Sequence, residues 1–242
     1  MGKKAEGKQG ISAFFRRAST PSNAELFPKR YAAALIAGWL LQWVLWGVWQ
    51  TFVLPRLPLS IGTTLLDSVA VKGLVFAALP IPFLFLFRKQ LHLPSKPPIR
   101  RPFPWLACTV LLCLVTAFLY TVRLLRGLVH TYAIFDPMFL VLSVSAGVIE
   151  EFYFRCVLFR LQDRMIGTLP AALLNGALFT LFHYPGILFG TSLMRLVSWR
   201  ALLIFVMGVV FCGMMKRWRS PALNMTVHSV WDLLTYLFCL AG

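Results

Sequence analysis

Charged residues are scarce in this sequence, and acidic residues are the scarcest. Only 13% of the 242 residues are charged, with eight Asp or Glu against 24 Lys or Arg, while 59% are hydrophobic. A soluble domain carries about twice that charged fraction. The composition therefore excludes an ordinary soluble domain and predicts an all-α fold, a polytopic membrane helical bundle.

The sequence also lacks the cysteine spacings and the helix motif that are typical of disulfide-rich and zinc-binding proteins. The five cysteines form no CxxC pair and lie in apolar stretches, which excludes a disulfide framework and a zinc knuckle. They are Cys108, Cys113, Cys156, Cys212 and Cys239. No HExxH helix occurs, and the first apolar run has no small-residue cleavage site, so a cleaved signal peptide is not expected.

The net charge of +16 is concentrated in short segments between apolar runs. This distribution is typical of cytoplasmic loops that face anionic lipid, and it argues against a nucleic-acid partner. Residues 1–30 are predicted to be a basic cytoplasmic N-terminal tail, either a short surface helix or a disordered segment. Residues 31–242 are predicted to form a single transmembrane helical domain, multi-pass in an integral membrane protein, with the 88–104 and 160–170 loops also cytoplasmic.

About eight helical segments fit the apolar runs. The predicted segments are 31–54, 65–87, 105–123, 137–161, 171–182, 187–200, 201–215 and 223–240. The segment 187–200 is short and contains Arg195, so it is also compatible with a re-entrant or interfacial element. Lys72 lies inside the second segment and is expected to snorkel to the interface or to pair, with Asp67 as a candidate partner.

The fourth segment holds the most informative charges, Glu150, Glu151 and Arg155. A carboxylate at membrane depth costs several kcal/mol on the order-of-magnitude insertion scales, so it needs an explanation. Neighbouring residues on a helix point about 100° apart, so the two glutamates cannot share one role. Glu151 precedes Arg155 by four residues and is expected to pair with it. Glu150 then needs a partner on another helix.

Three later segments add polar groups or close-packing residues. His183 follows Phe179 by four residues, Gly208 follows Phe205 by three, and Asp232 follows His228 by four. The aromatic and glycine face suits a close helix approach, and His228 and Asp232 project from one face of the last helix. Since lipid cannot satisfy such groups, the imidazoles and carboxylates are expected to line a polar intramembrane cavity.

Two kinds of chemistry fit these residues. A carboxylate and an imidazole around a water form a general base, and a second imidazole with a polar neighbour can stabilise an oxyanion. Alternatively, Glu150, His183 and His228 could bind one zinc ion as a His₂Glu metal site with an open position for water. The cofactor expected is therefore none or one zinc ion.

The four motifs in this order resemble the signature of the CPBP family, the CAAX protease and bacteriocin-processing (Abi) group of intramembrane proteases. The resemblance covers residues 137–242. It implies that Glu150 and His183 activate water and that His228 and Asp232 stabilise the oxyanion, with Glu151 and Arg155 supporting them. The family's eukaryotic prenyl-protein endopeptidase has Asn at the last position, where this chain has Asp232. An ionised Asp cannot donate a hydrogen bond, so Asp232 would have to be protonated or orient His228.

The predicted function is an intramembrane endopeptidase that hydrolyses a peptide bond of a membrane-anchored protein or peptide with Glu/His-activated water. The alternative is a catalytically silent membrane scaffold, or a bacteriocin-immunity-type protein, of the same fold. A proton-coupled transporter would also use buried Glu and His, but no internal repeat supports it.

Overall fold

The protein is helical in all the parts of the chain that the structure describes. The computed structural model describes residues 29–78, 80–82, 102–127, 137–190 and 193–237. Nearly all of the predicted basic tail, most of the predicted 88–104 loop and Cys239 lie outside these ranges. Within them no strand occurs, and the all-α prediction is confirmed.

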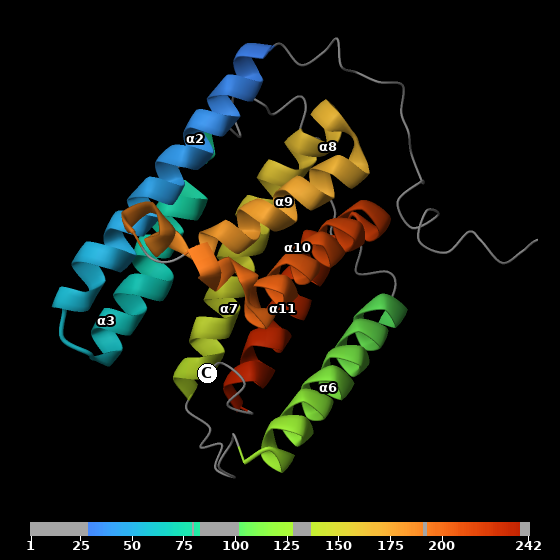
Figure 1. Ribbon diagram of the computed structural model, residues 1–242. Coiled ribbons are helices and arrows are strands. Elements are labelled where there is room, and N and C mark those ends of the chain that lie inside the picture. The colour runs from blue at the N-terminus through green and yellow to red at the C-terminus, as the bar shows by residue number, and fades with distance from the viewer. Residues whose placement is uncertain (1–28, 79, 83–101, 128–136, 191–192, 238–242) are drawn as a thin grey trace, which may run out of the picture.

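Within the described ranges, seven helices account for seven of the eight predicted segments (Figure 1). They are α2 (Lys29–Val48) continued by η2 (Trp49–Val53) and η3 (Leu54–Arg56); α3 (Ile61–Leu65) continued by η4 (Leu66–Val71) and η5 (Leu74–Ala78); α6 (Pro102–Leu125); α7 (Pro137–Glu151) continued by η6 (Phe152–Phe159) and α8 (Arg160–Ile166); α9 (Thr168–Phe182); α10 (Trp199–Trp218); and α11 (Pro221–Leu237). The described part of the predicted segment 187–200 contains two short 3-10 turns, η7 (Pro185–Phe189) and η8 (Leu193–Val197), before α10 begins.

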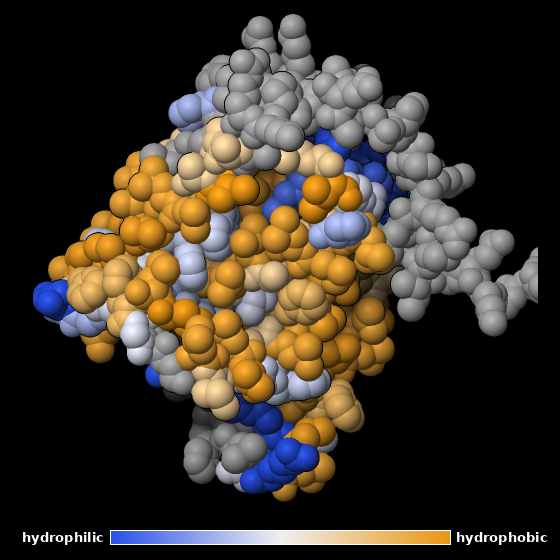
Figure 2. Space-filling model, turned by 45° about the horizontal axis from the view of Figure 1, so that its top comes forward, coloured by the Kyte–Doolittle hydropathy of each residue, from blue (hydrophilic) through white to orange (hydrophobic). Residues whose placement is uncertain are grey.

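In the part of the chain that the structure describes, four helices are long and apolar enough to cross a bilayer, which supports an integral membrane protein. The four spans are Ala33–Arg56, Ile61–Ala78, Trp105–Leu125 and Trp199–Trp218. Large apolar side chains of α6, such as Leu106, Leu114 and Phe118, are more than 60% exposed. Figure 2 shows a face on which apolar side chains predominate. Exposing such a large apolar surface to water is unfavourable, whereas the lipid chains of a bilayer can cover it.

A partly buried carboxylate ties the first two helices together. Asp67 Oδ1 accepts hydrogen bonds of 2.7 Å from Trp49 Nε1 and from Gln50 Nε2. Lys72 is paired, as expected, but its hydrogen bond does not go to the candidate partner Asp67. Instead, Lys72 Nζ donates to Glu150 Oε1 on α7 at 2.7 Å, because this helix packs against α7 and carries Lys72 toward the centre of the bundle.

The helix from Pro137 to Ile166 forms the centre of the fold, and its middle third is π-helical. In this stretch, η6, every residue from 153 to 159 is buried. A π turn departs from the usual backbone hydrogen-bond ladder, and such turns are frequent at functional sites. The Phe154 carbonyl accepts a hydrogen bond of 2.9 Å from Asn175 Nδ2 on α9. The irregular stretch thus begins directly after Glu151 and binds a neighbouring helix.

Glycines allow two pairs of helices to cross in contact. A Cβ atom on Gly208 of α10 would lie 2.9 Å from the Cα atom of Gly176 on α9. A Cβ atom on Gly147 of α7 would lie 2.3 Å from Ser229 Oγ on α11. Only residues without a side chain permit these approaches. The close approach predicted for the Phe205–Gly208 face is therefore present between α10 and α9, and the second crossing brings α11 against α7, the helix that carries Glu150.

Candidate active site

Glu150 lies near the end of α7 with its side chain only 4% exposed. Its Oε1 atom accepts the hydrogen bond from Lys72, so the partner on another helix that the sequence required is Lys72. The Oε2 atom has no hydrogen-bond partner among the described residues. It lies 3.9 Å from His183 Nε2 and 3.8 Å from His228 Nε2. One carboxylate oxygen is thus held by a cation, and the other faces two imidazoles.

His183 is placed at the very end of α9, where the helix stops before Tyr184 and Pro185. Its Nδ1 atom lies 2.8 Å from the Phe179 carbonyl oxygen. A carbonyl only accepts, so Nδ1 carries the hydrogen and Nε2 of the neutral ring presents a lone pair. The side chain is 27% exposed, more than that of Glu150 or His228. His183 therefore marks the open side of the site.

His228 approaches Glu150 from α11 and is held by three groups. Its Nδ1 atom donates to Glu151 Oε1 at 2.9 Å. Its Nε2 atom lies 3.6 Å from Asp232 Oδ2, one turn further along the helix. The ring stacks on Phe211 with centroids 5.4 Å apart. These contacts fix the ring so that Nε2 points toward Glu150 Oε2.

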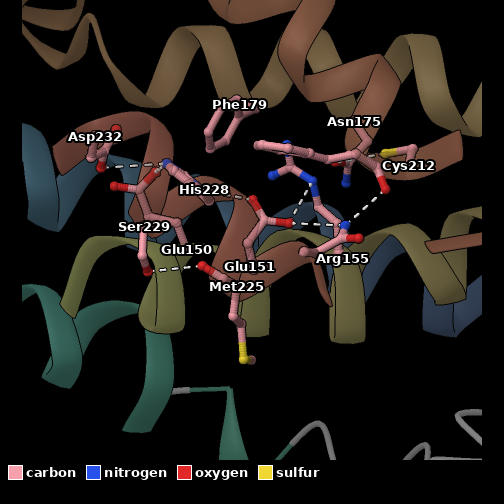
Figure 3. A network of polar contacts seen from close by, with 12 residues as sticks. Glu150, Glu151, Arg155, Asn175, Phe179, Cys212, Met225, His228, Ser229 and Asp232 are labelled. Carbon is pink, nitrogen blue, oxygen red and sulfur yellow. Dashed lines mark hydrogen bonds and ion pairs between the residues drawn. The ribbon is translucent and has the colours of Figure 1, made fainter. Parts of the chain in front are cut away.

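Glu151 and Arg155 form the expected ion pair behind the site, with Arg155 Nε 3.3 Å from Glu151 Oε2. Both side chains are fully buried. The guanidinium lies 4.2 Å from the Phe179 ring centroid and 5.3 Å from that of Phe211, within cation–π distance. In Figure 3, Glu151 lies between His228 and Arg155. The two adjacent glutamates therefore serve different neighbours, as the helix geometry requires.

Residues that the sequence reasoning did not single out complete the polar network. Asn224 Nδ2 donates to Glu151 Oε2 at 3.3 Å and to the Phe211 carbonyl at 2.8 Å. Asn175 Nδ2 also donates to Gln162 Oε1 at 3.1 Å. The Asn175 Oδ1 atom accepts from Cys212 Sγ at 3.3 Å (Figure 3). The sequence does carry a signal for these two asparagines. Each places an amide in an otherwise apolar helix, and lipid offers the amide no hydrogen-bond partner.

The zinc site that the sequence left open would require its three donors to move closer together and a neighbouring cation to be displaced. Zinc ligands lie about 2.0–2.2 Å from the metal, which would draw the donor atoms closer together than the 3.8 and 3.9 Å between Glu150 Oε2 and the two imidazoles. The Lys72 ammonium beside Glu150 also opposes a divalent cation. Among the described residues, no group of three His, Cys, Asp or Glu side chains is arranged to hold a metal ion. These residues can therefore act on water without a metal ion.

Comparison with known proteins agrees with the motif resemblance. Residues 132–234 match the family model of type II CAAX prenyl endopeptidase Rce1-like proteins. The matched segment contains Glu150, His183 and His228, and the resemblance to the CAAX protease group is confirmed. The match supports a membrane peptidase of the CAAX-protease type. No curated protein and no solved structure matches the chain.

Proposed function

We propose that this protein, which carries an Rce1-like domain over residues 132–234, is an intramembrane endopeptidase in which Glu150 and His183 activate water. The observation that carries the proposal is the buried Oε2 atom of Glu150, unpaired among the described residues and facing the Nε2 atoms of His183 and His228. A buried acceptor without a partner is costly, and a water molecule bound between these atoms would satisfy it.

The attack step uses the two acceptors. The water donates one hydrogen to Glu150 Oε2 and the other to the lone pair of His183 Nε2. As its oxygen bonds to the carbonyl carbon of the scissile peptide bond, one proton passes to Glu150. Glu150 is then the general base, and His183 keeps the water oriented. A positioned base typically contributes on the order of 10²–10⁴-fold to the rate.

The oxyanion is stabilised by His228. Its Nδ1 hydrogen is donated to Glu151, so donation from Nε2 requires the doubly protonated ring. Glu151 and Asp232 supply the negative charge that favours this form, and an ionised Asp232 thereby acts on His228 rather than as a donor to the oxyanion. The proton held by Glu150 then passes to the leaving nitrogen as the carbon–nitrogen bond breaks, which yields a carboxylic acid and an amine.

The proposed substrate is a membrane-anchored peptide that carries a prenyl group near its C-terminus. This assignment follows the described activity of the matched family, prenyl endopeptidase. The apolar exterior of the bundle is compatible with a substrate that arrives from within the bilayer. The N-terminus is proposed to be cytoplasmic, with the basic loops against anionic lipid.

Cleavage of a matched pair of peptides tests the function. Two fluorescence-quenched peptides with one sequence ending in Cys-aliphatic-aliphatic-X, one farnesylated and one not, are incubated with purified protein in lipid nanodiscs. We expect faster cleavage of the farnesylated peptide. The variant His183→Asn keeps an amide donor for the Phe179 carbonyl but lacks Nε2, and it is expected to be about 10²-fold slower. Failure of folded wild-type protein to cut either peptide would refute the peptidase proposal.

Zinc dependence is tested separately. Because the Lys72 ammonium already binds Glu150 and opposes a divalent cation there, we expect purified protein to contain zinc far below one equivalent and to keep its cleavage rate in a chelator. Elemental analysis and rates before and after chelation measure this. Stoichiometric zinc, together with activity lost to the chelator and restored by zinc, would contradict the metal-free mechanism.

A further inference from the structure

Lys72 reaches the candidate active site from outside the matched family segment. It lies between η4 and η5 in the second membrane-spanning helix, whereas the family match begins at residue 132. Its Nζ atom is 2.7 Å from Glu150 Oε1, and its side chain is only 13% exposed. A residue 78 positions away in the chain thus makes the closest polar contact of Glu150.

The surroundings of Lys72 leave the ammonium directed at Glu150. Nζ lies 5.6 Å from the ring centroid of Phe182 and 5.9 Å from that of Trp46. These two rings stack on each other at 5.6 Å and join α9 to α2. Aromatic faces attract a cation but accept no conventional hydrogen bond, so they hold the ammonium without competing for its donors. Phe182 also directly precedes His183, so one cluster positions both the lysine and the histidine.

The contact distinguishes the two oxygens of Glu150. Lys72 binds Oε1, and Oε2 is the oxygen that faces His183 and His228. Without the ammonium, the carboxylate could rotate about its terminal bond and either oxygen could take either place. The ammonium also compensates the negative charge of a carboxylate in an apolar interior, where an isolated charge is strongly disfavoured.

We propose that Lys72 is a positioning residue for Glu150: its ammonium holds Oε1 and keeps the carboxylate ionised, so that Oε2 is free to accept a proton from water. The inference rests on the proposed role of Glu150 as the general base. It means that the N-terminal half of the chain completes the active site and is required for catalysis rather than only for membrane insertion.

A purely structural role for Lys72 makes a different prediction. If the ion pair only joined the second helix to α7, its loss would lower the melting temperature and leave the turnover number of the folded protein unchanged. If Lys72 positions the base, its loss lowers kcat in the folded protein while substrate binding is preserved. Measuring kcat and KM of the folded variant therefore distinguishes the two roles.

The test compares three variants with the farnesylated quenched peptide in nanodiscs. Lys72→Met keeps the length of the stem without the charge, and Lys72→Arg keeps the charge. Lys216→Met is the matched control. Lys216 Nζ binds Asp163 Oδ2 at the same 2.7 Å, and the Lys216 side chain is about as exposed as that of Lys72. Asp163 lies on the same continuous helix as Glu150 but at its far end. We expect Lys72→Met to lower kcat at least about tenfold with KM changed less than about twofold, Lys72→Arg to retain most of kcat, and Lys216→Met to keep kcat.

If Glu150→Gln is inactive but Lys72→Met has the wild-type kcat, the positioning role of Lys72 is overturned and the proposed function stays intact.

If wild-type protein cuts no peptide, the proposed function fails, and the ion pair is then tested by melting temperatures alone. Lys72→Met should then destabilise the wild type and have little effect in the Glu150→Gln background. Equal destabilisation in both backgrounds would overturn the pairing itself.

Discussion

Replacement of Glu150 by glutamine is expected to lower the rate of peptide cleavage at least about 10²-fold, the usual lower scale for loss of a general base. The amide is nearly isosteric with the carboxylate, and its oxygen can still accept the hydrogen bond from Lys72. It cannot accept a proton from water at neutral pH. The measurement is kcat/KM for the farnesylated peptide, with the melting temperature recorded on the same preparation.

Asp163→Asn provides the matched control for this prediction. It makes the same carboxylate-to-amide change on the same continuous helix, at a position where the carboxylate binds Lys216 and Thr168 instead of facing the imidazoles. The control variant should cleave at close to the wild-type rate. If folded Glu150→Gln protein also cleaved at close to the wild-type rate, Glu150 would not be the base, and a scaffold with the same fold would become the better explanation.

Replacement of Arg155 by alanine is expected to have the largest effect on stability. The change removes the cation from a fully buried pair and leaves Glu151 charged in the interior, which typically costs roughly 3–5 kcal/mol. It also removes the cation–π contacts with the rings of Phe179 and Phe211. We expect a large drop in the melting temperature in detergent, measured by scanning fluorimetry of purified protein.

Two comparisons make the stability prediction specific. Arg217→Ala, which removes an exposed arginine from the last turn of α10, should change the melting temperature little. Glu150→Ala should have an intermediate effect at most, because the Lys72 and His183 side chains that it leaves without their carboxylate are 13% and 27% exposed, whereas Glu151 and Arg155 are fully buried. If Arg155→Ala and Arg217→Ala melted at the same temperature, the buried pair would not be an important source of stability.

Features that depend on local spacing and on the cost of polar groups in lipid could be predicted from the residues alone. Composition and apolar runs were enough for an all-α membrane protein. The four-residue interval between Glu151 and Arg155 was enough for their ion pair, because the helix repeat brings such residues to one face. The same repeat separated Glu150 from Glu151 and implied that Glu150 must find its partner elsewhere. The motif order was enough to indicate the CAAX protease group.

Contacts between groups on different helices, in contrast, could be identified only from the three-dimensional packing. Lys72 could equally have paired with Asp67, five residues away on its own helix, and the choice of Glu150 depends on how the second helix packs against α7. The hydrogen bond from His228 to Glu151, and the amides of Asn175 and Asn224, likewise depend on the crossings at Gly147 and Gly208. Sequence spacing determines the face of one helix on which a side chain lies. The facing helix, its depth and its rotation are set by the packing of the whole bundle, which no local pattern encodes.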